Sequence, residues 1–255
     1  MNIWQVVVMA VVEGVTEFLP ISSTGHLVLT GEVLRVAQTE FVKSFEVAIQ
    51  LGAILAVVGL YWRRLVMDMK TMKRVMVAFV PTGVLGLIAY PYIRQYLLGN
   101  PTVTVVALVV GGGVMVFVER FKTYDSRFKI GELSYGRAVV IGLVQSVSMI
   151  PGVSRAMATI LGGMGVGLSR AQATEFSFLL AIPTMAAATG LDLIKSGSSF
   201  TGGEWGMLGV GFAVAFVTAL AAVKWLIGYV QKHDFTAFGM YRIILGVLFG
   251  VVYLR

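Results

Sequence analysis

The sequence predicts an all-α integral membrane protein with six transmembrane helices and two re-entrant helical hairpins, arranged as an inverted-topology repeat. The first observation behind this is composition: of 255 residues, 57% are hydrophobic and 13% are charged, which is far more apolar than a soluble domain. The second is a series of long apolar stretches, and the third is a pair of matching interruptions that contain proline and serine. Together they indicate that the solvent of this chain is the lipid bilayer.

Six apolar stretches are long enough to cross a membrane, because a helix needs about 20 predominantly apolar residues to span the hydrocarbon layer. The six stretches are Phe45–Trp62, Val75–Leu97, Val103–Val118, Phe176–Ile194, Met207–Tyr229 and Phe238–Leu254. The third and the sixth of these are at the short end of the accepted range of lengths.

Two further apolar segments, Ile3–Leu34 and Tyr135–Val166, are each interrupted near the middle. The interruptions are Phe18–Gly25 and Ile150–Ser154. In each, the residue before proline is disfavoured in a helix, and a following serine can cap a new helix. Each arm then has roughly 10–15 residues, or about 15–22 Å, which is too short to span a bilayer. We therefore expect two re-entrant hairpins.

A constant offset of 131 residues relates the two hairpins and the spans that follow them. Within one membrane domain, 1–255, the repeat halves cover about 1–125 and 132–255. Each half has one hairpin and three spans, and an odd number of spans inverts the second half relative to the first. The superposed pairs include Pro20 with Pro151, Ser23 with Ser154 and Phe45 with Phe176.

Lysine and arginine residues crowd one side of this predicted topology, which should be the cytoplasmic side. The first hairpin would then enter the membrane from outside and the second from the cytoplasm, so that their tips meet near the midplane. The net charge of +7 is explained by topology, and nucleic-acid binding is not expected. The crowded side has Arg63, Arg64, Lys70, Lys73, Arg74, Arg120, Lys122, Arg127, Lys129, Arg137, Arg170 and Lys232, and the other side has Arg35, Lys43, Arg94, Lys195 and Arg255.

Glu13 and Glu17 stand four residues apart in the first arm of the first hairpin, so they share one helix face. A carboxylate inside the membrane is expensive and usually functional. Two adjacent acids demand a cation, which makes them candidate metal ligands. The structural alternative is a wet helix end at which they only pair with a basic side chain.

The first break places Ser22, Ser23, Thr24, Gly25 and His26 in one run. Hydroxyl groups and the free N–H groups of a helix N-terminus are suited to bind phosphate, although N-capping alone would explain Ser22 and Thr24. A lone histidine is more often structural than catalytic. His26 could nevertheless face a bound phosphate as an acid, a base or a nucleophile.

The second break places Ser154 and Arg155 at the matching tip. A guanidinium group is well fitted to phosphate oxygens and to the charge that develops during phosphoryl transfer. An arginine in mid-membrane needs an anionic partner. Arg155 therefore either binds phosphate or pairs with Glu13 or Glu17, and both hold if the ligand replaces a resting salt bridge.

Glu46 and Gln50 recur at helical spacing in the next helix, and Glu175 opens the equivalent helix of the second half. These residues either support the site, with Gln50 as a candidate substrate-binding residue, or only form hydrogen bonds between helices.

The run Glu13–His26, together with Pro151–Arg155, resembles the undecaprenyl-diphosphate phosphatase family, also called bacitracin-resistance proteins. The likeness covers nearly the whole chain. It implies hydrolysis of the lipid undecaprenyl diphosphate to undecaprenyl phosphate and phosphate with a divalent cation, Mg2+ or alternatively Ca2+. It also implies a multi-pass protein of the bacterial cytoplasmic (inner) membrane that recycles the lipid carrier for cell-wall synthesis, with a site open to the external, periplasmic side. Whether the protein is a homodimer stays open.

Carried over by motif, the resemblance makes Glu13 and Glu17 the acidic pair that holds the metal. The first choice of nucleophile is Ser23, with His26 or a water activated by Glu17 as alternatives. One departure is that the family usually continues Ser-Arg-Ser-Gly-Ala-Thr, whereas Ala156-Met157-Ala158-Thr159 follows here. The expected catalytic residues are Glu17, Ser23, His26 and Arg155, and the expected substrate-binding residues are Ser22, Thr24, Gly25, Gln50, Ser154 and Thr159.

Two rival functions fit parts of the sequence. Inverted repeats with broken helices also build the substrate sites of secondary transporters, so a transporter or flippase of a lipid phosphate is the main alternative. The second rival is the other large class of membrane lipid phosphatases. Its signature, Ser-Arg-x5-His-x3-Asp, fails here because Leu161 stands where the histidine is needed.

Overall fold

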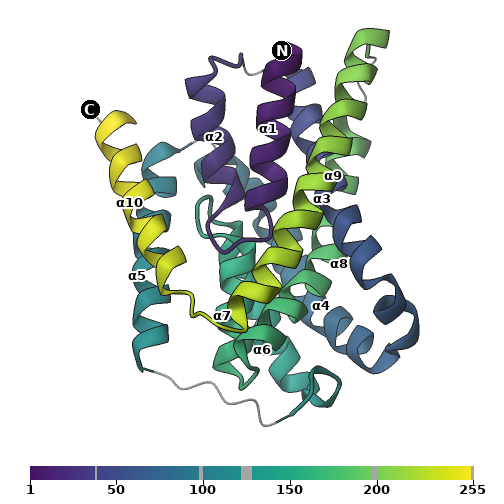
Figure 1. The fold of residues 1–255 in the computed structure, drawn as a ribbon, viewed down its shortest axis with the longest axis vertical. Helices are drawn as coiled ribbons and strands as arrows, with labels where there is room; N and C mark the ends of the chain where they lie inside the picture. Colours follow the sequence, from purple (N-terminus) through teal and green to yellow (C-terminus); the bar gives the residue numbers. More distant parts are fainter. Residues whose placement is uncertain (38, 98–99, 122–127, 197–199, 254–255) are drawn as a thin grey trace.

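The computed structural model describes residues 1–37, 39–97, 100–121, 128–196 and 200–253, and within these ranges it contains helices and no strands (Figure 1). A π-helical turn follows α4 at Ile93–Leu97, and short 3-10 turns lie at Ile130–Glu132 and Val147–Met149. The α-helices are α1 (Ile3–Thr16), α2 (Ser23–Val33), α3 (Glu40–Met67), α4 (Met69–Tyr92), α5 (Pro101–Phe121), α6 (Tyr135–Ser146), α7 (Arg155–Gly165), α8 (Arg170–Ser196), α9 (Gly202–Val230) and α10 (Thr236–Tyr253).

Four of the described helices are long and apolar enough to cross a membrane, so the chain is a multi-pass membrane protein. These helices are α3, most of α4, most of α5, and α9. The predicted spans Phe176–Ile194 and Phe238–Leu254 are helical as expected but do not meet that threshold of length and apolarity, and residue 254 lies outside the described residues. α10 is apolar, and its described part is too short to meet the threshold.

Each of the two segments predicted as hairpins consists of a helix, a break and a second helix. α1 and α2 lie in the upper half of Figure 1, whereas α6 and α7 lie in the lower half, so the two breaks face each other near the middle of the molecule. Glycine lets each first arm approach a long helix, because a Cβ at either position would overlap that helix. At Gly14 it would overlap Thr218 Oγ1 of α9, and at Gly142 it would overlap the Ala78 carbonyl oxygen of α4.

The predicted offset of 131 residues is wrong by one residue within the hairpins. α2 and α7 begin at positions 23 and 155, and the serines that precede them, Ser22 and Ser154, both have a φ of 73°. The next residues with positive φ, Arg35 and Gly167, repeat the same offset of 132. Ser22, and not Ser23, is therefore the counterpart of Ser154. The offset of 131 aligns identical residue types, whereas the backbone conformations of the two breaks align at an offset of 132.

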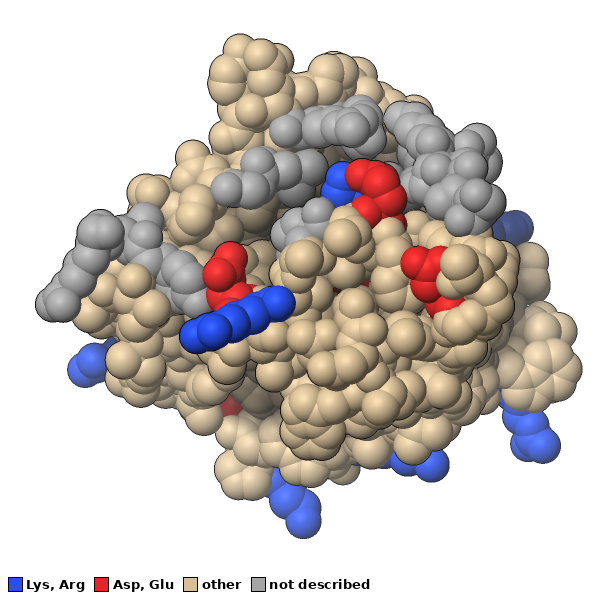
Figure 2. Space-filling model, turned by 90° about the horizontal axis from the view of Figure 1, so that it is seen from above, with Lys and Arg blue, Asp and Glu red and all other residues tan. Residues whose placement is uncertain are grey.

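Basic residues at one end of the bundle join helices that are distant in sequence. Arg64 of α3 forms an ion pair with Glu175 of α8, and Arg170 of α8 pairs with Glu119 of α5 at 2.5 Å. Glu175 therefore stabilises the bundle, one of the two roles predicted for it. The opposite end of the molecule shows acidic groups on its face, while basic side chains stand mostly at its margin (Figure 2).

Candidate active site

A buried ion pair connects the two breaks. Arg155, the first residue of α7, donates from Nη2 to Glu17 Oε1 at 3.0 Å, and the side chains are 11% and 8% exposed. Glu17 follows the end of α1, and its N–H donates to the Glu13 carbonyl, so the two acids share a helix face as predicted. Removing one partner would leave an uncompensated buried charge, which typically costs about 3–5 kcal/mol.

The other carboxylate oxygen of Glu17 binds the hydroxyl of Ser23. Ser23 Oγ lies 2.5 Å from Glu17 Oε2, a short distance typical of a hydroxyl that donates to a carboxylate. Ser23 is the first residue of α2 and is only partly buried. Its proton is thus already directed at a base, which is the arrangement that activates a serine nucleophile.

Arg155 is also held from its other side by α8. Nη1 donates to the carbonyl oxygen of Ser177 at 3.1 Å and lies 3.4 Å from its hydroxyl, which is 2.6 Å from Thr159 Oγ1. The guanidinium carbon stands 5.4 Å from the centre of the Phe18 ring. Arg155 Nε is buried without a partner among the described residues. The guanidinium is fixed in position but retains an unused donor.

Glu13 is the more deeply buried acid of the pair. Its side chain is fully buried, and neither carboxylate oxygen has a hydrogen-bond partner among the described residues. The charges of Glu17, Glu46 and Arg155 act on it. The described residues hold no cluster of three or more His, Cys, Asp or Glu side chains that could bind a metal alone. Mg2+, however, is often held by one or two carboxylates plus substrate phosphates, and Glu13 with Glu17 fits that pattern.

The ring nitrogens of His26 bond to Ser22 and Tyr241 and not to the acid pair. Its Nδ1 lies 2.7 Å from the carbonyl oxygen of Ser22, and its Nε2 lies 2.6 Å from the hydroxyl of Tyr241. A carbonyl can only accept, so Nδ1 carries the proton, and in the neutral ring Nε2 accepts from Tyr241. The two rings are also stacked, with centroids 5.6 Å apart. Both nitrogens are engaged, unlike those of a free nucleophile.

The remaining predicted residues surround the breaks in different ways. Ser154 caps α7, because its Oγ accepts from the N–H of Met157 at 3.2 Å. Ser22 is the N-cap of α2 by position, but its side chain makes no capping bond, so the predicted serine cap is wrong for the first hairpin. Thr24 is exposed, Gly25 packs on Leu108, and Gln50 is half-buried one turn beyond Glu46 on α3.

Arg242 is a buried residue beside the two breaks to which the sequence alone assigned no role. It is fully buried in α10, and it donates from Nη1 to the Pro20 carbonyl at 3.3 Å and from Nη2 to the carbonyls of Gly152 and Ala107 at 2.9 and 3.1 Å. It thus joins both breaks to α5. An arginine within an apolar stretch is a signal that could have identified it.

Comparison with known proteins identifies the family of this chain. The family described as "Bacitracin resistance protein BacA" matches residues 6–248. A protein of Aquifex aeolicus named undecaprenyl-diphosphatase is 50% identical, with 100% of both chains covered. Proteins of the same name from Sulfurihydrogenibium sp. and Thermus thermophilus are 49% and 46% identical, covering 99% of this chain and 100% and 98% of theirs. The chain therefore belongs to the bacitracin resistance protein BacA family.

Proposed function

We propose that this protein hydrolyses undecaprenyl diphosphate to undecaprenyl phosphate and inorganic phosphate. The observation that carries the proposal is the hydrogen-bonded group of Arg155, Glu17 and Ser23 at the facing breaks, on a chain 50% identical to an undecaprenyl-diphosphatase. In this group Arg155 binds the phosphate, Glu17 is the base and the Ser23 hydroxyl is the nucleophile. Arg155 and Ser23 are both bonded to Glu17, so the three groups that phosphoryl transfer requires lie together.

In the proposed reaction, the terminal phosphate replaces Glu17 as the partner of Arg155. Ser23 Oγ attacks the terminal phosphorus and transfers its proton to Glu17, while the bridging oxygen leaves with undecaprenyl phosphate. Water then hydrolyses the phosphoserine, which regenerates Ser23 and releases phosphate. A water activated by Glu17 is the alternative nucleophile, and the engaged ring of His26 makes that residue the least favoured of the three.

A divalent cation, Mg2+ or Ca2+, would be held by Glu13 and Glu17 together with diphosphate oxygens. Bound there, it would neutralise negative charge on the substrate. The unpartnered carboxylate of Glu13 supports this assignment. Ser22, Thr24, Gly25, Ser154 and Thr159 are proposed to contribute hydroxyl and backbone N–H groups around the phosphates, and Gln50 is proposed to support them from α3.

The proposed topology has six spans and two re-entrant hairpins in an inverted repeat, within the bacterial inner membrane. The facing breaks support the inverted hairpins, and the basic groups gathered at one end support a cytoplasmic location for that end. The first hairpin would then open the site to the external side. The same architecture is found in transporters, so translocation of a lipid phosphate is retained as the second candidate.

A phosphate-release assay on purified protein in detergent separates these functions, because no gradient exists there. We expect release from undecaprenyl diphosphate, its loss with chelator, and its recovery on adding Mg2+. Ser23→Ala and Arg155→Lys should each lower turnover by about 100-fold or more. Ser146→Ala is the matched hydroxyl control, since Ser146 bonds to its own helix at the Gly142 carbonyl. Absence of release by wild type would overturn hydrolysis and favour the transporter.

A further inference from the structure

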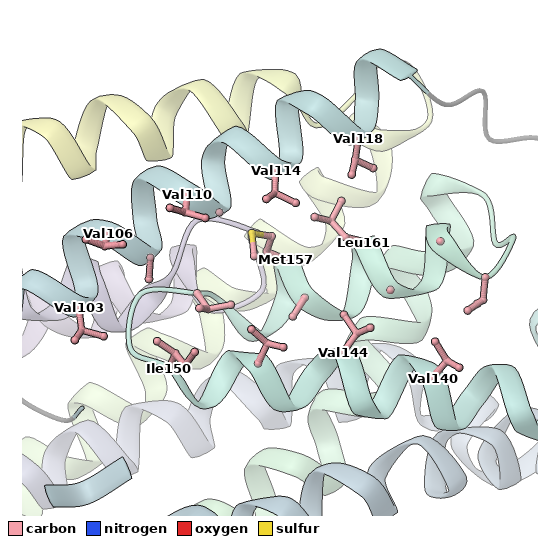
Figure 3. A pocket seen from close by; sticks show the side chains of 18 of the residues that line it. Val103, Val106, Val110, Val114, Val118, Val140, Val144, Ile150, Met157 and Leu161 are labelled. Carbon is pink, nitrogen blue, oxygen red and sulfur yellow. The ribbon is translucent and has the colours of Figure 1, made fainter. Parts of the chain in front are cut away.

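A long apolar groove runs along one side of the molecule, between α5 and the pair α6 and α7. Its cavity volume is about 830 Å3, within the range of ligand-binding pockets. Valines at helical spacing from Val103 to Val118 form the α5 wall, and Val140, Val144, Met157 and Leu161 form the opposite wall (Figure 3). Asn100 and Thr102 are the polar residues at one end.

The groove is open toward the surface that the bilayer would cover. Val110 is 58% exposed and Val140 is 44% exposed, although both line the groove. α5 packs closely along α10 and touches α7 at few positions, which leaves the space beside α6 unfilled. Because the lining is apolar except for Asn100 and Thr102 at one end, the natural occupant is a hydrocarbon chain and not a polar ligand.

Midway along its length, the groove passes residues that flank the candidate phosphate clamp (Figure 3). Val153 and Met157 both line it, and Ser154 and Arg155 lie between them in the chain. The same wall includes Gly111, where a Cβ would stand 3.1 Å from Met157 Sδ and would overlap the guanidinium of Arg242. A chain attached to a phosphate at Arg155 would therefore meet the groove beside Met157, between its two ends.

We propose that this groove binds the polyprenyl chain of the lipid diphosphate whose head group is bound at Arg155. The inference rests on the proposed function and extends it to the rest of the substrate. Lipid tails are as apolar as valine, so the groove adds little affinity over the bilayer. It acts by orienting the substrate, so that the terminal phosphate reaches Ser23 in line.

Met157 lines the groove where the groove passes the candidate phosphate clamp (Figure 3). The related motif carries glycine at this position, whereas Met157 places a flexible thioether side chain between α7 and α5. The departure in the second motif thus falls on the wall of the chain-binding groove. The side chain of Arg155, two residues earlier, keeps its contacts with Glu17 and Ser177.

Photolabelling tests occupancy of the groove without relying on hydrolysis. Wild-type protein in phospholipid nanodiscs is labelled with a polyprenyl monophosphate that carries a diazirine in its chain, and in parallel with a diazirine phospholipid. We expect the polyprenyl probe to label peptides of α5 and α6 about tenfold more than the phospholipid does. Equal labelling by the two probes would mean that only bilayer lipid occupies the groove, and it would overturn the proposal. Labelling confined to other helices, or a second copy of the chain bound across the groove, would overturn it as well.

Obstruction of the groove tests its role in turnover. Val110→Trp should lower kcat/KM for undecaprenyl diphosphate by about tenfold, while short-chain farnesyl diphosphate stays within about threefold. Val247→Trp is the matched control, because Val247 is 52% exposed on α10 and does not line the groove. An equal loss on both substrates, or no loss on either, would overturn the groove. If wild type released no phosphate yet labelled in the groove, only the proposed hydrolysis would fail.

Discussion

Arg242 Nη2 donates to the carbonyl oxygen of Gly152 at 2.9 Å, and so a residue of α10 supports the second break from a position 90 residues away in sequence. The same guanidinium supports the first break through the Pro20 carbonyl. No acidic side chain forms an ion pair with it among the described residues. The positive charge of Arg242 is instead stabilised by the partial negative charges of these carbonyl oxygens. Because one guanidinium bonds to both breaks, it fixes the distance between them.

Replacing Arg242 should therefore separate the breaks. Arg242→Met leaves the carbonyls of Pro20, Gly152 and Ala107 buried without that donor, and each such loss costs about 1–3 kcal/mol. We expect the free energy of unfolding to fall by about 3 kcal/mol or more, and kcat to fall by about 100-fold because Glu17 and Arg155 lose their alignment. Chemical unfolding in detergent and phosphate release measure the two effects.

Arg242→Lys is the companion variant. It keeps the charge but presents a single ammonium group in place of the planar fork, so stability and turnover should lie between those of wild type and Arg242→Met. Wild-type turnover in Arg242→Met would contradict the positioning role, even if the variant were less stable.

Thr159 and Ser177 form a second support for Arg155. Their hydroxyl oxygens are 2.6 Å apart, and both residues are fully buried. Thr159→Val keeps the shape but removes the hydroxyl, which should cost about 1–2 kcal/mol of stability and lower kcat/KM by about tenfold. Thr159→Ser should restore both quantities. If Thr159→Val were as active as wild type, the support of Arg155 on the α8 side would come from the backbone carbonyl of Ser177 alone.

The sequence predicted the long helices better than the contacts at their centre. α3, α5 and α9 follow directly from apolar stretches, and the charged residues Glu13, Glu17 and Arg155 were found because charge is rare in such stretches. The backbone register of the breaks was missed, since the strained serines at φ 73° differ from their neighbours in backbone conformation and not in residue type. The bonds of Arg242 span 222, 135 and 90 residues, and no local pattern encodes them.

His26 is expected to be a supporting residue, because both of its ring nitrogens are engaged. His26→Gln should lower turnover by less than about tenfold, and Tyr241→Phe by less than about fivefold. The same phosphate-release assay compares them with Ser23→Ala. A loss in His26→Gln equal to that of Ser23→Ala would make His26 the better candidate nucleophile.

Asp68 supplies a pH-dependent contact at the junction of α3 and α4, outside the membrane-spanning segments. Its Oδ1 accepts from the N–H of Thr71 at 3.0 Å, and its Oδ2 lies 2.7 Å from the Thr71 hydroxyl. These bonds, backbone first, lower the pKa of Asp68 below its usual value, and the nearby charge of Arg64 adds to the effect. Asp68→Ala should cost about 1 kcal/mol, as the loss of a helix N-cap does.

Because the folded-state pKa of Asp68 is depressed, its stabilising contribution is fully present above the pKa of the unfolded chain, about 4. It is lost as the pH falls through the lower folded-state value. The difference in unfolding free energy between wild type and Asp68→Ala should thus be constant from about pH 8 to pH 5 and shrink below about pH 4. Glu132→Gln, which removes the carboxylate that accepts from the Lys129 N–H, serves as a capping control at a different turn. A difference that grew on acidification would show that the protonated form of Asp68 is the one stabilised.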